Sequence, residues 1–198
     1  MPAKRTSALS SEPYPTITRR YAARAAAASP RAYSMTLHEL VRPDSVLCNV
    51  EARSRKHALE ILSELLSHGS DDLRQADIFA AIAERERLGC TALGRAVAAP
   101  HARLADAPFP IGALLKLSTP VDFDTPDDEP VDLIFGLIVP EDVDEQAVED
   151  FRGLTEMLSQ ADTQARLRKA RSSRELYEAL MAEDRPRAEG GLAAGGEG

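Results

Sequence analysis

Hydrophobic residues recur at helical spacing in two segments of the first half of the chain. Residues 55–67 carry apolar side chains three and four positions apart, which predicts an amphipathic helix that stops before Gly69. A second helix is expected to begin at Asp71-Asp72, because acidic side chains favour a helix N-terminus, and to end at Gly89. The apolar face of this second helix consists of Ile78, Phe79, Ile82 and Leu88.

Three segments that follow have the composition of β-strands. They span residues 96–99, 111–117 and 131–139, and the second alternates between larger apolar side chains and small or polar ones. The third is apolar at almost every position, which is typical of a central strand covered on both faces. An acid-rich loop at 122–130 separates the last two strands.

Helical periodicity returns in the last third of the chain. One helix is expected over residues 143–158, and a short one runs from Asp162, its capping residue, to Ala170. Ser172 and Glu175 form a capping box that opens a final helix. Helices on both sides of apolar strands predict an α/β fold, a layered mixed β-sheet flanked by helices, over residues 35–184.

Both ends of the chain differ in composition from this domain. Residues 1–34 are rich in Ala, Ser, Arg and Pro without a sustained hydrophobic period, which indicates a disordered extension. A mis-called start, with Met35 as the working initiator, explains this segment equally well, and its Arg- and Ser-rich character also resembles an organelle transit peptide. The Gly- and Ala-rich residues 185–198 are expected to be a disordered tail.

Composition excludes several classes of protein. The first 34 residues hold six Lys/Arg and one acidic residue, so the rest of the chain is more acidic than the net charge of −8 indicates. Such a body argues against nucleic acid as a partner, because phosphate contacts need clustered cations. The longest apolar run, residues 133–139, is too short to cross a bilayer. The two cysteines cannot form a disulfide framework or fill a zinc site, which favours a cytoplasmic protein with reduced thiols and no metal.

The chemistry-bearing residues are concentrated between positions 85 and 104. His101 follows a short predicted strand and Pro100, and Arg85 and Thr91 precede it. A neutral imidazole is nucleophilic near physiological pH, and a guanidinium group matches the oxygens of a phosphate. Such a histidine could therefore accept a phosphoryl group. The glycines of this segment are not followed by a Lys-Ser/Thr pair, so it predicts no nucleotide site, and no cofactor is expected.

Residues 85–104 resemble the active-site signature of the enzyme IIA domains of the bacterial phosphotransferase system, in the mannitol/fructose class. That signature begins Arg-Glu, continues Gly-Ser-Thr-Gly-Ile-Gly and ends Ile-Pro-His-Gly/Ala-Arg/Lys, whereas this chain has Arg-Glu, Gly-Cys-Thr-Ala-Leu-Gly and Ala-Pro-His-Ala-Arg at the same places. Residues 53–62, 130–140 and 167–177 extend the resemblance over the whole predicted domain. Within the class, the chain is similar to the nitrogen-regulatory branch, enzyme IIA-Ntr.

The resemblance implies a role for each of three residues. His101 would be the phosphoacceptor, Arg85 would stabilise the transferred phosphoryl group, and Thr91 would donate a hydrogen bond to the phosphate. The donor would be an HPr-like phosphocarrier, NPr, so the protein would be a phosphohistidine carrier of the transferase class rather than a free-standing enzyme. Its phosphorylation state would control regulatory targets such as potassium-transport or sensor-kinase systems.

The chain departs from the family pattern in ways that leave an alternative open. Cys90 replaces a serine of the signature, and three alanines replace glycines that many members have. Members typically carry a second histidine seven residues past the proline that ends the third strand, where this chain has Ala147. Glu145 or Glu149 could orient the ring of His101 instead. The alternative function is a non-catalytic interaction module that keeps the fold and binds a target without phosphotransfer.

Overall fold

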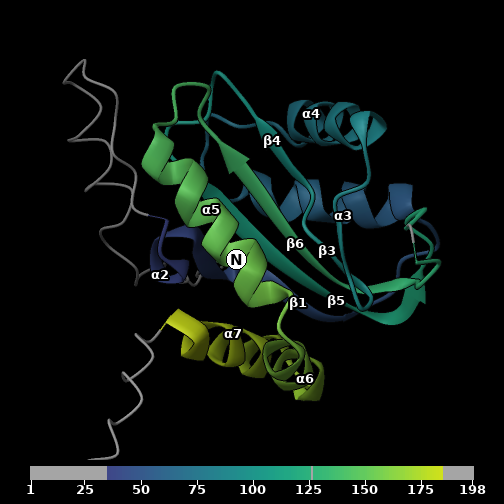
Figure 1. Cartoon of the computed structure of the whole chain (residues 1–198). Helices are drawn as coiled ribbons and strands as arrows, with labels where there is room; N and C mark the ends of the chain where they lie inside the picture. The colour runs from purple at the N-terminus through teal and green to yellow at the C-terminus, as the bar shows by residue number, and fades with distance from the viewer. Residues whose placement is uncertain (1–34, 126, 185–198) are drawn as a thin grey trace, which may run out of the picture.

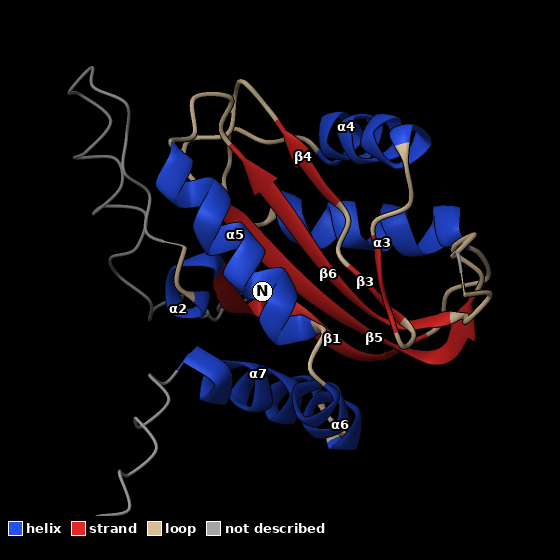
Figure 2. Ribbon diagram, in the orientation of Figure 1, coloured by secondary structure: helices blue, strands red, loops and turns tan. Residues whose placement is uncertain are grey.

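A six-stranded mixed β-sheet forms the centre of the molecule (Figures 1 and 2). The computed structural model describes residues 35–125 and 127–184. The strands follow the order β1-β5-β6-β3-β2, and β4 also pairs with β6. Their bounds are β1 (Val41–Val50), β2 (Ala92–Gly94), β3 (Val97–Ala98), β4 (His101–Arg103), β5 (Ile111–Val121) and β6 (Val131–Val139).

The two long central strands, β5 and β6, pair antiparallel and supply core side chains to both faces of the sheet. Along β6, Ile134 and Ile138 lie in one buried cluster, whereas Leu133, Phe135 and Leu137 lie in the other. This alternation follows from the two-residue period of a strand. The prediction of a central strand over residues 131–139, buried on both faces, is confirmed.

One face of the sheet is covered by α3 (Arg55–Ser67) and α4 (Gln75–Leu88). Ser54 caps α3 by accepting a hydrogen bond from the backbone N–H of His57. Gly136 of β6 allows α3 to approach closely, because a Cβ atom there would lie 2.7 Å from Leu62 Cδ1. Leu62 is completely buried against the sheet, so this contact anchors α3.

The opposite face is covered by α2 (Leu37–Leu40), α5 (Glu145–Leu158), α6 (Ala161–Lys169) and α7 (Ser173–Met181), and the short 3-10 helix η1 (Ala182–Asp184) follows α7. Asp144 caps α5 through the backbone N–H of Ala147, at 2.8 Å. Ser172 caps α7 by accepting from Glu175 N at 3.2 Å, as predicted. The predicted layered α/β arrangement, with a mixed sheet between helices, is confirmed.

Two predicted helix starts are wrong. Asp71-Asp72 lie in a turn, and α4 begins only at Gln75, so the acidic residue in its first turn is Asp77. The side chain of Leu88 is 82% exposed and does not belong to the buried face of α4. Asp162 lies inside the first turn of α6, whose capping position is Gln160.

The strands differ from prediction where their sequences lack regular apolar patterning. The segment 96–99 forms only the two-residue β3, and β5 extends to Val121, with nearly every residue from 111 to 117 buried rather than alternating. The strands β1, β2 and β4 were not predicted.

Within the described residues, no helix is long and apolar enough to cross a membrane. The terminal segments 1–34 and 185–198 lie outside the described residues, and so do the expectations about them.

Candidate functional site

His101 is the first residue of β4, at the point where the chain leaves β3 through Ala99 and Pro100. Its backbone pairs with Leu137 of β6, whose N–H donates to the Pro100 carbonyl at 3.0 Å. The ring Nδ1 lies 3.0 Å from the carbonyl oxygen of Ala99. A carbonyl can only accept a hydrogen bond, so the neutral ring carries its proton on Nδ1 and its lone pair on Nε2.

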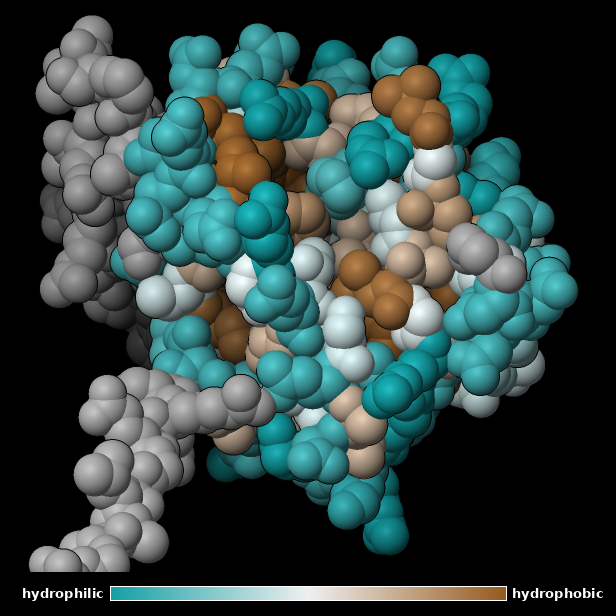
Figure 3. Space-filling view, in the orientation of Figure 1, coloured by the Kyte–Doolittle hydropathy of each residue, from teal (hydrophilic) through white to brown (hydrophobic). Residues whose placement is uncertain are grey.

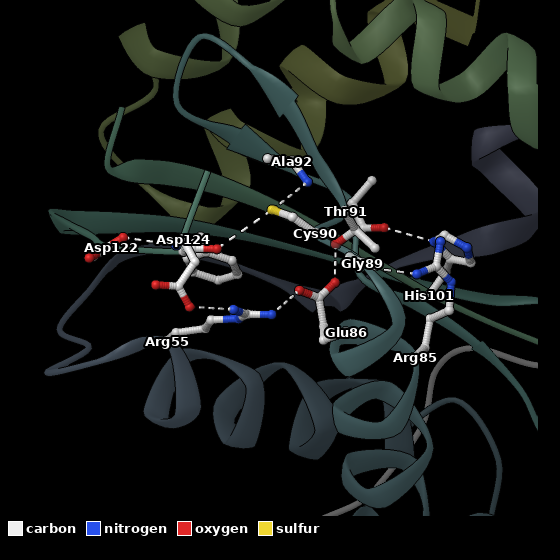
Figure 4. Close-up of polar contacts among 12 residues, drawn as sticks. Arg55, Arg85, Glu86, Gly89, Cys90, Thr91, Ala92, His101, Asp122 and Asp124 are labelled. Carbon is white, nitrogen blue, oxygen red and sulfur yellow. Dashed lines mark hydrogen bonds and ion pairs between the residues drawn. The ribbon is translucent and has the colours of Figure 1, made fainter. Parts of the chain in front are cut away.

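A cationic side chain stands on one side of this ring. Arg85 belongs to the last turn of α4, and its guanidinium donates to the carbonyl of Gly89 at 3.2 Å. Figure 4 shows Arg85 and His101 next to each other, although they come from α4 and β4. The structure therefore brings together two of the three residues that the resemblance singled out.

Beyond Arg85 lies a buried carboxylate, Glu86, which is 5% exposed. One of its oxygens pairs with the Arg55 guanidinium at 2.5 Å, and the other accepts a hydrogen bond from the Thr91 hydroxyl. Arg55 also pairs with Asp124 at 3.0 Å and lies over the ring of Phe123. Burial of the Glu86 charge is compensated on both oxygens, as buried ions require. Thr91 thus uses its single hydroxyl hydrogen on Glu86 (Figure 4).

On its other side, His101 faces apolar side chains. The ring of Phe151, from α5, lies 4.7 Å from the imidazole centroid to centroid, with the two planes inclined by 59°. A pocket of about 210 Å³ opens here, and Figure 3 shows hydrophobic surface in a hollow beside α5. The pocket is lined by Met35, His101, Ala102, Arg103, Leu137, Val139, Val143, Ala147, Val148 and Phe151.

These surroundings lower the pKa of His101 below its ordinary 6.5. Burial contributes most, because it disfavours the charged imidazolium, and the positive charge of Arg85 acts in the same direction. The Ala99 carbonyl and the Glu86 carboxylate oppose the shift, since both favour a protonated ring. The net effect is a larger fraction of neutral, nucleophilic imidazole near physiological pH.

Family comparison identifies the chain. The model of the family described as "Phosphoenolpyruvate-dependent sugar phosphotransferase system, EIIA 2" matches residues 39–183, which include His101, Arg85 and Thr91. The chain belongs to this family. The resemblance inferred from the sequence is confirmed.

Relatives place the chain in the nitrogen-regulatory branch of this EIIA family. It is 39% identical to the nitrogen regulatory protein of Pseudomonas aeruginosa over 145 residues, which cover 73% of this chain and 94% of that protein. The nitrogen regulatory protein of Escherichia coli K12 is 34% identical over 148 residues, which cover 74% of this chain and 90% of the relative. Among solved structures, the nitrogen regulatory protein IIA-Ntr of Neisseria meningitidis superimposes with a TM-score of 0.68 at 35% identity, covering 73% of this chain and 98% of that structure. The IIA mannitol structure of Escherichia coli shares the fold, with a TM-score of 0.58 at 20% identity, covering 71% and 98%.

In this EIIA chain, Ala147 lines the same pocket as His101 and is 2% exposed. The idea that a nearby glutamate orients the imidazole is wrong for Glu149, whose carboxylate pairs with Arg152 at 3.2 Å and lines a separate hollow. Glu145 lies in the first turn of α5 and does not line the His101 pocket. The contacts that the ring itself makes are with the Ala99 carbonyl and with Phe151.

Sequence reasoning missed Phe151 and Glu86. Phe151 lies one helical turn after Ala147, so the helical period of residues 143–158 places both on one face, which was an available signal. Glu86 is the glutamate of the Arg-Glu pair that begins the signature, which was an available signal, but its partner Arg55 is distant in the sequence. Cys90 packs its Sγ 3.5 Å from the Phe123 carbonyl, as a small half-buried side chain. Among the described residues, no cluster of His, Cys, Asp and Glu could hold a metal ion.

Proposed function

We propose that the protein is a regulatory phosphocarrier of the nitrogen-related phosphotransferase system, and that His101 accepts the phosphoryl group. The observation that carries this proposal is the state of the imidazole. Its Nδ1 is 3.0 Å from a carbonyl oxygen, which leaves the Nε2 lone pair as the nucleophile. Membership in the EIIA family supports the assignment of this lone pair to phosphoryl transfer.

The donor is a phosphohistidine of an HPr-like carrier, NPr. In the transfer, a bond forms between His101 Nε2 and phosphorus while the bond between phosphorus and the donor imidazole breaks. The donor ring keeps that electron pair, and the Nδ1 proton of His101 stays in its hydrogen bond to the Ala99 carbonyl. The reaction therefore exchanges one N–P bond for another and needs no nucleotide.

Arg85 and Thr91 act on the transferred group in different ways. The Arg85 guanidinium is the cation next to His101 and stabilises the charge of the phosphoryl oxygens. A phosphate dianion only accepts hydrogen bonds, and Thr91 already donates its hydrogen to Glu86. Thr91 can therefore serve the phosphate only after it turns away from Glu86.

Phosphorylation changes the charge of the surface around His101. It adds roughly two negative charges near neutral pH, which is enough to create or block a protein interface. We assign regulation to this change, with target proteins such as potassium-transport or sensor-kinase systems bound in one state and released in the other. This role places the protein in the cytoplasm.

The test is the intact mass of the protein after incubation with phosphoenolpyruvate, enzyme I and the HPr-like carrier. The wild type should gain the mass of one acid-labile phosphate, and His101→Ala should gain none. Arg74→Ala, at the exposed N-terminal end of α4, is the matched control and should be phosphorylated like the wild type. No gain in the wild type with a carrier that phosphorylates a related EIIA protein would refute the proposal.

One observation favours a second function, a non-catalytic interaction module. Ala147 provides no ionisable group in the pocket next to His101, where the family resemblance leads us to expect a second histidine. On this alternative, the unmodified protein binds its target and the mass assay shows no phosphate. A target that binds the wild type and His101→Ala equally, with and without the phosphate donor, would support the module.

A further inference from the structure

We propose that Phe151 is a positioning residue for His101, and that its ring fixes the imidazole in the orientation that directs Nε2 to the incoming phosphoryl group. The inference rests on the proposed function for the reaction that it serves. Its first observable, the state of the unphosphorylated imidazole, is independent of that function. The two can therefore fail separately.

Two contacts restrain the imidazole from different directions. The hydrogen bond from Nδ1 to the Ala99 carbonyl lies in the plane of the ring and selects the protonated nitrogen. The Phe151 ring packs at 4.7 Å with a 59° inclination, close to the tilted geometry that aromatic pairs prefer. Rotation of His101 about its Cβ–Cγ bond would break the hydrogen bond to Ala99 and change the inclination of the imidazole against the Phe151 ring.

Phe151 is itself held in place by α5. The helix is fixed at its N-terminus by the Asp144 cap, and Leu154 and Leu158 bury its inner face against the sheet. Ala147 lies one turn before Phe151 on the same face, and its small side chain leaves the space into which the 210 Å³ pocket opens. An aromatic contact thus orients the ring where this chain has no second imidazole.

Charged side chains approach His101 from α4 and β4, whereas the side chains from α5 and β6 are apolar. Arg85 and Glu86 face it from α4, and Arg103 follows it in β4. On the sides formed by α5 and β6, the pocket has no ionisable side chain among the described residues. Because Phe151 packs on the imidazole from this apolar side, its removal would expose the ring to water, weaken the burial that disfavours the imidazolium, and free the ring to rotate.

The experiment compares Phe151→Ala, Phe151→Leu and a matched variant, Met157→Ala, in the full-length chain. Met157 is a half-buried residue of the same helix, packed against the same core but outside the pocket. Long-range ¹H–¹⁵N NMR titration of the unphosphorylated proteins reports the pKa and the tautomer of His101. Single-turnover phosphorylation at a pH well above 6.5 reports the transfer rate when the ring is neutral.

Phe151→Ala should raise the pKa of His101 towards 6.5, mix the two tautomers, and lower the high-pH transfer rate by about tenfold through misorientation. Phe151→Leu should recover most of the pKa and part of the rate, because it restores apolar cover but not the ring. Met157→Ala should leave pKa, tautomer and rate at their wild-type values.

The inference is overturned if Phe151→Ala keeps the wild-type pKa, tautomer and rate, or if Met157→Ala changes them as much. A wild type that accepts no phosphate refutes the proposed function instead. The NMR arm would then still decide whether Phe151 orients the ring.

Discussion

The two sides of His101 differ in almost every physical property. On the α4 side, Arg85, Glu86 and Thr91 carry charge and hydrogen bonds, and Arg55 extends this network to the acidic loop. On the α5 side, the same ring meets Phe151 and a pocket with apolar walls. The imidazole thus lies between a polar network and a pocket lined mainly by apolar side chains.

The difference separates two requirements of phosphoryl acceptance. On the proposed function, the polar side supplies the cation that stabilises a transferred phosphoryl group. The apolar side contributes to the burial that is the largest cause of the lowered pKa of His101, and on our proposal it also orients the imidazole. Each side can be altered independently, because the residues concerned come from different helices.

The largest effect is expected from Arg85→Ala on the polar side. Removal of the cation should lower the rate of phosphoryl transfer to His101 by about 10²–10³-fold, a magnitude typical of lost electrostatic stabilisation. Rapid-quench mass measurements give this rate, and circular dichroism should show an unchanged fold. Arg74→Ala, in an exposed pair at the other end of α4, should retain the wild-type rate. Equal losses in the two variants would remove any special role for Arg85.

Glu86→Ala should mainly affect stability. It would leave Arg55, whose side chain is 23% exposed, without its buried partner and Thr91 without its acceptor, at a cost of about 3 kcal/mol in the free energy of unfolding. Asp77→Ala breaks an exposed pair on the same helix and should cost less than about 1 kcal/mol. Urea unfolding measures both values. Similar costs would mean that the Glu86 network adds nothing beyond surface pairing.

Because the pKa of His101 is lowered, the stability of the protein is expected to depend on pH. The folded protein holds His101 with a pKa below 6.5, so the unfolded chain binds the proton more readily between the folded pKa and 6.5. The contribution of His101 to stability is therefore present above pH 6.5 and is lost as the pH falls through that window to the folded pKa. The difference in unfolding free energy between the wild type and His101→Ala, measured from pH 5 to 8, should rise with pH. A flat difference would contradict the lowered pKa.

The smallest effect concerns the helix that carries Phe151. Gly153 lies in α5, and a Cβ atom added there would meet nothing within 4 Å. Gly153→Ala should raise the free energy of unfolding by about 0.5–1 kcal/mol, because glycine is a poor helix former. Thermal unfolding and the His101 titration should show a more stable protein with an unchanged imidazole. A shifted titration would mean that helix stability, rather than the Phe151 contact, controls the ring.

The sequence predicted a helix or strand accurately where the element has a regular apolar pattern within its own residues. The helix α3 and the strand β6 were predicted to the residue, because each buries a regular apolar set between clear stop signals. The strand β1 was not predicted, because it contains Pro43 and Asp44 and its sequence does not alternate between apolar and polar residues. Its pairing with β5 is likewise irregular, with shifts of register. The family resemblance singled out Arg85 and His101, and the structure brings the two together.

The parts of the site that the sequence did not predict depend on contacts between distant segments. The burial of Glu86 is tolerated because Arg55 reaches it from α3, and nothing within α4 indicates that partner. The hydrogen bond of the Thr91 hydroxyl to Glu86 was not predicted, and the role of Thr91 towards a phosphate stays a prediction. The turn between β2 and β3 was also not predicted. Ala96 there adopts a left-handed φ of 62°, a conformation that favours glycine, so its residue type did not indicate the turn.

The most direct test of the account is ¹⁵N and ³¹P NMR of the phosphorylated protein with labelled histidine. The account predicts that Nε2 of His101 carries the phosphorus, that Nδ1 keeps its proton in the bond to Ala99, and that the other histidines are unmodified. Phosphorus on Nδ1 of His101, or on His38, His57 or His68, would contradict the assigned nucleophile.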